Sequence, residues 1–186
     1  MPSFVHSVVA ALLWLLVAAP SPASAQNATQ NKDAPTEQGV TRLGSAEGWS
    51  AYSDTEKNRK VCYLVGEPSK VEPASAKREK AQATVTHRPH EKVANEVSFK
   101  AGYAFKEGSD AELMVDGKKF SLFTNKDAAW SRDAATDRAV VDAMAKGKHA
   151  VFKGVSTRGT ATTDTYALAG FAQALAQIDK ACGVKR

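Results

Sequence analysis

Two cysteines, Cys62 and Cys182, are the only thiols among the 186 residues of this chain and the groups best suited to covalent chemistry. They do not form the C-x-x-C arrangement of dithiol redox motifs. Their only cationic neighbours in the sequence are Lys60 and Lys180, which gives little reason to expect an activated thiolate. We therefore predict a structural disulfide. It would close a loop of about 120 residues, for which the chain-entropy relation gives roughly 4 to 5 kcal/mol of stabilisation.

His87 and His90 have the spacing H-x-x-H, with Glu91 adjacent, which raises the question of a metal site. Zinc sites use three or four protein ligands, and His149 is the only other histidine outside the N-terminal leader described below. Pro89 lies between the pair and prevents a helix that presents both imidazoles on one face. We therefore expect no metal and no other cofactor.

Ser156, followed by Arg158 and Asp164, marks the one stretch that suggests a hydrolase. The run from Gly154 to Gly159 lacks the G-x-S-x-G elbow that presents a hydrolase nucleophile. A strand end and turn fixed by hydrogen bonds between Arg158 and Asp164 explains the same residues. We predict that the protein is not an enzyme. If the loop does form a site, Arg158 is the anion-binding group and Ser156 a donor beside it.

Positive charge is concentrated in one part of the chain. The formal net charge is +5, and between Lys57 and Lys92 the sequence has an excess of cationic over acidic side chains. Such a stretch suits an anionic glycan or lipid, although a solvated surface is the simpler interpretation. The candidate anion-binding or partner-binding residues are Lys57, Arg59, Lys60, Lys77, Arg78, Lys80 and Arg158.

Residues 1–25 are typical of a secretory signal peptide. The apolar stretch from Val8 to Ala19 is shorter than the about 20 residues that a membrane span needs. Ala23-Ser24-Ala25 fits the small-x-small pattern before a cleavage site. Export to an oxidising compartment favours the disulfide and argues against a nucleic-acid partner. We expect the mature protein in the periplasm, at the outer-membrane surface or secreted, without a membrane span after cleavage.

The rest of the chain divides into a tether and one domain. Residues 26–47 are poor in large apolar side chains, which predicts a flexible tether. Residues 48–186 are numerous enough for one hydrophobic core. Residues 68–80, which include two prolines and several lysines, are expected to be an exposed connection. Within the domain, alternating apolar residues between turn residues predict strands at 49–52, 61–65, 82–86, 96–105, 111–115, 119–123, 150–156 and 165–168.

Asp116-Gly117 predicts a tight hairpin between two of these strands. Two helices are also predicted: one capped by Asp137 and ended by Gly147, the other over residues 171–181. The fold class is mainly β (α+β), an antiparallel β-sandwich or barrel-like sheet with two covering helices. Most of the aromatic side chains are expected to face its core: Trp49, Tyr52, Tyr63, Phe99, Tyr103, Phe120, Phe123, Trp130, Tyr166 and Phe171.

Short motifs spread over residues 48–183 share their order and spacing with one known family. The motifs are Trp49, Cys62, Glu96-Val97-Ser98, Gly102-Tyr103, Asp116-Gly117, Phe120, Ala129-Trp130, Met144, Gly147, residues 154–160, residues 164–171 and Ala181-Cys182. As a set they resemble the invasion-associated locus B family of exported alphaproteobacterial proteins. The resemblance implies a cell-envelope protein whose founding members are linked to host-cell invasion without an established enzymatic activity.

From the residues and the resemblance together we expect a non-catalytic exported cell-envelope protein. It would act through interaction with an unidentified envelope or host protein, with host-cell association or invasion as the inherited role. One alternative is an envelope factor that binds anionic glycan or lipid through a basic surface. A less favoured alternative is a hydrolase at Ser156. Ionic strength separates the first two hypotheses, because charge-driven binding weakens with salt.

Overall fold

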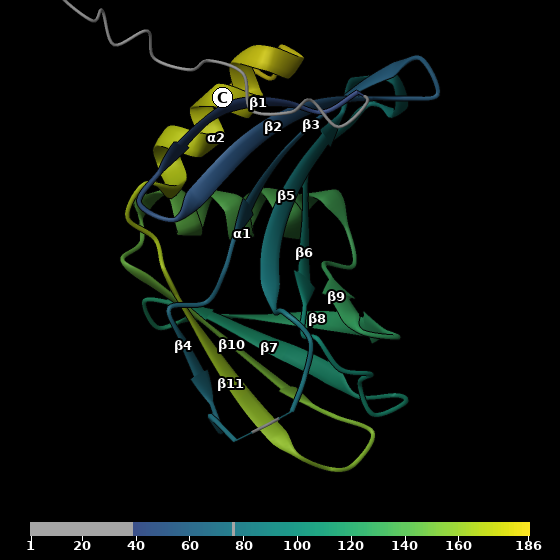
Figure 1. The fold of residues 1–186 in the computed structure, drawn as a ribbon, viewed down its shortest axis with the longest axis vertical. Coiled ribbons are helices and arrows are strands. Elements are labelled where there is room, and N and C mark those ends of the chain that lie inside the picture. The colour runs from purple at the N-terminus through teal and green to yellow at the C-terminus, as the bar shows by residue number, and fades with distance from the viewer. Residues whose placement is uncertain (1–38, 76) are drawn as a thin grey trace, which may run out of the picture. The chain divides into compact units, whose positions relative to one another are not determined.

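The computed structural model describes residues 39–75 and 77–186, which form one antiparallel sheet of eleven strands and two helices (Figure 1). The strands are β1 (Thr41–Ala46), β2 (Trp49–Glu56), β3 (Arg59–Gly66), β4 (Lys70–Glu72), β5 (Gln82–Arg88), β6 (Val93–Lys100), β7 (Asp110–Val115), β8 (Lys118–Asn125), β9 (Ala128–Trp130), β10 (His149–Val155) and β11 (Ala161–Ala167). Their order in the sheet is β1-β2-β3-β5-β6-β9-β8-β7-β10-β11-β4. The predicted mainly β fold with two helices is confirmed, and the sheet is open because β1 and β4 form its edges.

The sheet curls around its own core. In the sheet, β6 and β10 are separated by β9, β8 and β7, yet the rings of Phe99 and Phe152 stack with centroids 4.9 Å apart. Tyr166 on β11 meets Phe99 edge-on at 5.6 Å. These side chains are fully buried, so the inward faces of the two halves of the sheet pack against each other.

Helices α1 (Ala134–Lys146) and α2 (Phe171–Cys182) cover the strands near the start of the domain (Figure 1). Helix α2 packs on β1, β2 and β3, helix α1 packs on β6, and the two helices touch each other. The predicted N-cap of α1, Asp137, was wrong, because the helix is capped one turn earlier by Asp133. Asp133 has an extended backbone and its carboxylate accepts the N–H of Thr136 at 2.7 Å, which places Asp137 inside the first turn.

Trp49 anchors α2 to the sheet. Its indole donates a hydrogen bond to the Ala167 carbonyl at 2.9 Å, and its ring meets Phe171 edge-on at 4.9 Å. Gly66, its register partner on β3, leaves space for the ring, because a Cβ at that position would lie 2.5 Å from the indole. The predicted apolar face of α2 is confirmed, since Phe171, Leu175 and Ile178 are buried.

The predicted Asp116-Gly117 hairpin is confirmed between β7 and β8. Both residues have positive φ, +44° and +92°, as a tight two-residue reversal requires. The Asp116 carboxylate also accepts the N–H groups of Lys148 and His149 at 2.7 and 3.2 Å. The Lys148 bond above all lowers the pKa of Asp116, and it ties the hairpin to the start of β10.

Part of the predicted tether is folded. Within the range 26–47, β1 pairs with β2, so the domain begins earlier than residue 48. Backbone pairing orders this segment with only Leu43 packed at the edge of the core, which explains why its composition gave little indication of a strand. Similarly, β4 lies inside the predicted exposed connection and pairs with β11, although its side chains are exposed. The predicted signal peptide and residues 26–38 lie outside the described residues.

The predicted disulfide is present between Cys62 on β3 and Cys182 at the end of α2. Their Cα atoms are 6.0 Å apart, within the usual range for a bridge. Cys62 is fully buried, so the bond fixes the last turn of α2 against the centre of the first half of the sheet. No helix in the described ranges is long and apolar enough to cross a bilayer.

Candidate functional site

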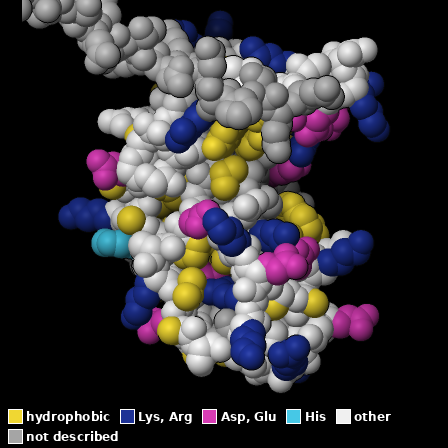
Figure 2. Space-filling view, in the orientation of Figure 1, with side chains coloured by type: hydrophobic (Ala, Val, Ile, Leu, Met, Phe, Trp, Pro, Cys, Tyr) yellow, Lys and Arg dark blue, Asp and Glu magenta, His cyan; other side chains and the backbone are white. Residues whose placement is uncertain are grey.

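The predicted basic surface is divided between distant parts of the domain. Lys57, Arg59 and Lys60 lie at the β2–β3 hairpin, whereas Lys77, Arg78 and Lys80 lie in the connection between β4 and β5. Figure 1 places the hairpin at the top of the view and this connection at the bottom. On the face that Figure 2 shows, Lys and Arg side chains are dispersed, with Asp and Glu between them. The sequence stretch is therefore not one basic patch.

Arg78 is not a surface residue, contrary to the prediction. Its guanidinium donates to both carboxylate oxygens of Asp164, one of them at 2.9 Å, and to the Ala101 carbonyl at 3.0 Å. Side-chain exposure is 6% for Arg78 and 0% for Asp164. The hydrogen bond to Asp164 raises the pKa of Arg78 further above its usual value. We call this buried pair the Arg78 pin, because it fastens the β4–β5 connection to the sheet.

The predicted ion pair between Arg158 and Asp164 is not formed. The prediction placed Asp164 at the end of a loop, but β11 already begins at Ala161. Alternation along β11 turns Thr162, Asp164 and Tyr166 inward, where all three are buried. Arg158 is exposed in the turn between β10 and β11, so the ion-pair partner of Asp164 is Arg78.

A recess of about 540 Å³ lies where this turn meets the β4–β5 connection. It brings together four predicted residues, Lys77, Arg78, Ser156 and Arg158, and we call it the Arg158 pocket. Lys80 lies outside it and pairs with Glu67 at 3.1 Å. The full lining is Lys77, Arg78, Glu79, Gly102, Tyr103, Ala104, Ser156, Thr157, Arg158, Thr160 and Thr162.

Five residues in the lining of the Arg158 pocket carry hydroxyl groups: Tyr103, Ser156, Thr157, Thr160 and Thr162. The Tyr103 and Thr162 oxygens are 2.5 Å apart, and Ser156 Oγ accepts the N–H of Thr160 at 3.2 Å. The guanidinium carbon of Arg78 lies 5.9 Å from the centre of the Tyr103 ring. Burial raises the pKa of Tyr103, so its phenol stays protonated at neutral pH.

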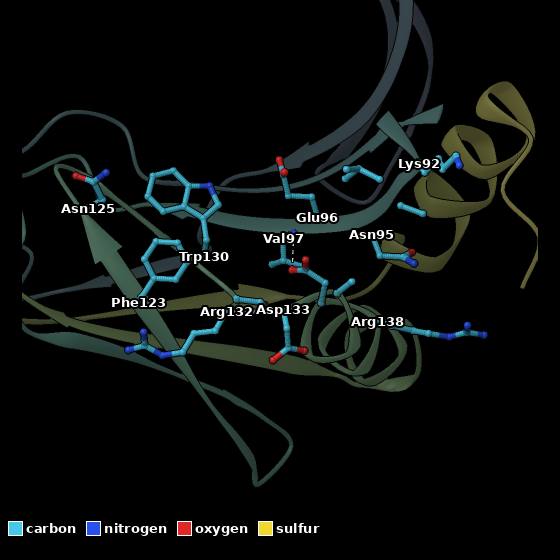
Figure 3. Close-up of a pocket in the computed structure, with 15 residues that line it drawn as sticks. Lys92, Asn95, Glu96, Val97, Phe123, Asn125, Trp130, Arg132, Asp133 and Arg138 are labelled. Atoms are coloured by element: carbon cyan, nitrogen blue, oxygen red, sulfur yellow. Dashed lines mark hydrogen bonds between the residues drawn. The ribbon is translucent and has the colours of Figure 1, made fainter. Parts of the chain in front are cut away.

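A larger groove, of about 690 Å³, lies between β6, β9 and the start of α1 (Figure 3). We call it the Trp130 groove. Trp130 and Phe123 are cross-strand partners at one end of it, and their rings stack at 5.7 Å. Arg132 lies over Phe123, its guanidinium carbon 5.8 Å from the ring centre. The lining residues are Lys92, Val93, Ala94, Asn95, Glu96, Val97, Phe123, Asn125, Trp130, Ser131, Arg132, Asp133, Ala134, Asp137 and Arg138.

The groove exists because β9 is short. Along β6 it pairs only with Ser98, Phe99 and Lys100, so the start of α1 takes the place of a strand beside the first half of β6. There the Asp137 carboxylate accepts the N–H of Val97 at 3.0 Å. Burial raises the pKa of Asp137, and the bond from Val97 opposes this shift only in part.

We predicted that most of the aromatic side chains face the core, but the stacked side chains of Phe123 and Trp130 in this groove do not. Phe120, Leu122 and Ala129 are buried, whereas Phe123 and Trp130 are half-exposed on the opposite face of their strands. The period-2 pattern contains this information, because residue 123 is out of phase with residues 120 and 122. What the sequence did not indicate is the shortness of β9.

His87 and His90 lie in different surroundings. His90 lies in the short 3-10 turn Pro89–Glu91, whereas His87 is fully buried on β5. His87 Nε2 contacts Asp179 Oδ1 at 2.9 Å, and its Nδ1 accepts the N–H of Asn95 at 3.0 Å. Within the described ranges, no three His, Cys, Asp or Glu side chains are grouped to hold a metal ion.

Arg186 joins His87, Asn95 and Asp179 from the surface, and we call the four residues the Arg186 cluster. Arg186 donates from Nε to Asp179 at 2.6 Å and from Nη2 to the Asn95 amide oxygen at 2.6 Å. Burial alone would raise the pKa of Asp179, but the hydrogen bonds from His87 and Arg186 lower it overall. Because Cys62 is the register partner of His87, the Arg186 cluster lies beside the disulfide.

These features define a class: a disulfide-bonded α+β domain with an open, curled antiparallel sheet and recesses on its surface. The family model described as "Invasion associated locus B (IalB) protein" matches residues 49–179. The chain belongs to this family, and the resemblance inferred from its motifs is confirmed. Comparison with curated proteins and with solved structures finds no match.

Proposed function

We propose that this protein is a non-catalytic, exported cell-envelope protein that binds another protein through the Trp130 groove. The observation that carries the proposal is the half-exposed stack of Trp130 on Phe123, with Arg132 over it. Trp and Arg are enriched among the residues that contribute most to protein interfaces, especially where they line a recess. The groove also offers carboxylates and amides, which orient a partner segment through hydrogen bonds.

The compartment and role follow from three kinds of support. Residues 1–25 have the pattern of a signal peptide, and the Cys62–Cys182 bridge suits an oxidising compartment. The family description connects its members with invasion. On this basis the protein acts in the periplasm or at the cell surface, and association with host cells is its proposed role.

A non-catalytic role is supported by the surroundings of the two groups that would serve a hydrolase. Ser156 Oγ in the Arg158 pocket accepts the N–H of Thr160, and Asp164, which is not in the pocket lining, has both carboxylate oxygens bound by Arg78. His87 is paired with Asp179 in the arrangement of a catalytic dyad, yet Asn95 donates to its other nitrogen. Asp164 is buried and paired with a cation, and both imidazole nitrogens of His87 are already hydrogen-bonded, so neither group is placed to remove a proton from a nucleophile.

Site-directed photo-crosslinking tests the proposal. A photoreactive residue at Asn125, in the groove, is expected to trap a discrete partner in intact cells, identified by mass spectrometry. The purified partner is then titrated against two variants. Trp130→Ala should weaken binding at least 10-fold, as loss of an interface anchor does. Tyr52→Ala, which breaks a similar stack with Tyr63 on β2 and β3, should change it less than 2-fold.

The salt dependence of the same titration separates the proposal from its polyanion alternative. Binding in a packed groove should change little between low and high ionic strength, whereas a charge-driven contact weakens steeply. Equal binding by Trp130→Ala and the unaltered protein, or hydrolysis of a model ester that Ser156→Ala abolishes, would overturn the proposal.

A further inference from the structure

The Arg158 pocket carries uncompensated positive charge. Of its three cations, Arg78 is neutralised by Asp164, but Lys77 and Arg158 have no ion-pair partner among the described residues. The one acidic residue in the lining is Glu79, which shares Lys100 with Asp127, at 3.6 and 3.4 Å. Lys77 and Arg158 therefore exceed the acidic charge of the lining and give the pocket a net positive charge.

The hydroxyl groups of the pocket are arranged to donate. One of the Tyr103 and Thr162 hydroxyls donates to the other, which leaves one proton of the pair for a ligand. Ser156 Oγ is occupied as an acceptor by the Thr160 N–H, so its own proton is also free. Hydrogen-bond donors beside two cations favour an oxyanion over a neutral ligand or a cation.

The floor of the pocket is preorganised. The Glu79 N–H donates to the Gly102 carbonyl at 2.9 Å, and a Cβ at Gly102 would lie 2.2 Å from the Glu79 carbonyl oxygen. At Gly154 a Cβ would lie 2.5 Å from the Phe105 ring and 2.8 Å from the Tyr103 hydroxyl. The backbone is packed too closely there to rearrange freely, so a ligand meets a site that is already built.

We propose that the Arg158 pocket binds a phosphoryl group carried on a sugar. Two cations match the charge of a phosphate monoester near neutral pH, and its three terminal oxygens can accept from Lys77, Arg158 and the hydroxyl groups. The volume of about 540 Å³ lies within the range of small-molecule sites and has room for the sugar ring. This site is separate from the Trp130 groove and does not depend on the proposed function.

Titration with glucose 6-phosphate tests the proposal, with glucose, inorganic phosphate and phosphatidic acid vesicles as parallel probes. Glucose 6-phosphate should bind, phosphate should bind more weakly, and glucose should not bind. Arg158→Ala should weaken binding at least 10-fold. Lys80→Ala removes a cation of the same connection that lies outside the pocket, and it should change binding less than 2-fold.

Amide chemical-shift mapping of the unaltered protein gives a readout that does not depend on any variant. The expected result is perturbation centred on Ser156, Arg158 and Thr160. If only vesicles bind, and Arg158→Ala abolishes that binding, the phosphoryl group comes from a lipid headgroup and the assignment of the pocket stands. Binding by none of the probes, equal losses in Arg158→Ala and Lys80→Ala, or shifts elsewhere would overturn it.

Discussion

The two ends of the domain are fastened in different ways. At the helical end, α2 is joined to β3 by a disulfide, and the Arg186 cluster adds hydrogen bonds among His87, Asn95 and Asp179. At the other end, the β4–β5 connection is held by the Arg78 pin, whose carboxylate is fully buried, and by the backbone bond from Glu79 to Gly102. The comparison indicates that a covalent bond fastens the first end, whereas the buried charges of the Arg78 pin are the main fastening of the second.

The largest loss of stability is expected from removal of the disulfide in Cys62→Ala/Cys182→Ala. The chain-entropy relation gives a loss of about 4 to 5 kcal/mol for a closed loop of this length. Chemical denaturation of the variant, beside the unaltered protein with and without reductant, measures it. A loss of stability well below this figure would contradict the expectation. It would mean that the non-covalent contacts of the Arg186 cluster, and not the disulfide, are the main fastening of α2.

The Arg78 pin should come next. Asp164→Ala leaves the guanidinium buried without its partner, and such changes reduce the free energy of unfolding by about 3 to 4 kcal/mol. The double variant Arg78→Met/Asp164→Leu removes both charges and should recover much of the loss. Arg158→Ala, at the exposed turn nearby, serves as the control. If the double variant is no more stable than Asp164→Ala, the loss in Asp164→Ala does not come only from leaving Arg78 unpaired. The hydrogen bonds of the Arg78 pin would then themselves stabilise the fold.

Acid should loosen the helical end through Asp179. Because the pKa of Asp179 is lowered in the folded protein, its contribution to stability is complete above the ordinary carboxyl value of 3.8. That contribution is lost as the pH falls through the lowered folded value. Unfolding measured from pH 7 to pH 2 should show a shallower acid slope in Asp179→Asn. Asp142→Asn, on the exposed side of Arg186, should keep the slope of the unaltered protein.

The smallest effect is expected at Tyr166, which lies two residues from Asp164 on β11. Its hydroxyl is buried and has no hydrogen-bond partner among the described residues, and burial raises its pKa strongly. Tyr166→Phe should therefore leave stability unchanged or raise it by about 1 kcal/mol, because a desolvated hydroxyl is removed. A clear loss in thermal unfolding would mean that this hydroxyl supports the Arg78 pin.

Local patterns predicted much of the fold. The Asp116-Gly117 turn, the apolar face of α2 and the pairing of Cys62 with Cys182 depend on short-range spacing or on a simple count of thiols. The tether was misjudged because β1 is ordered by backbone pairing, for which composition carries little information.

The sites were harder to predict, because tertiary pairing decides them. Arg78 and Asp164 are 86 positions apart, and nothing in the sequence distinguishes Arg78 from the exposed cations around it. The Arg158 pocket was found in part, since Ser156 and Arg158 were identified together. Lys77 joins them only through the path of the β4–β5 connection, and the Trp130 groove appears only because β9 stops short of the first half of β6.

The bridge also determines what proteolysis does to this domain. Its two sulfurs lie 120 positions apart, so every peptide bond in the Arg158 turn, the β4–β5 connection and the β7–β8 hairpin lies inside the closed ring. A protease that cuts once at any of these places opens the ring but releases nothing. The nicked molecule migrates as one species until its disulfide is reduced, so a single cut does not separate the Trp130 groove from the Arg158 pocket.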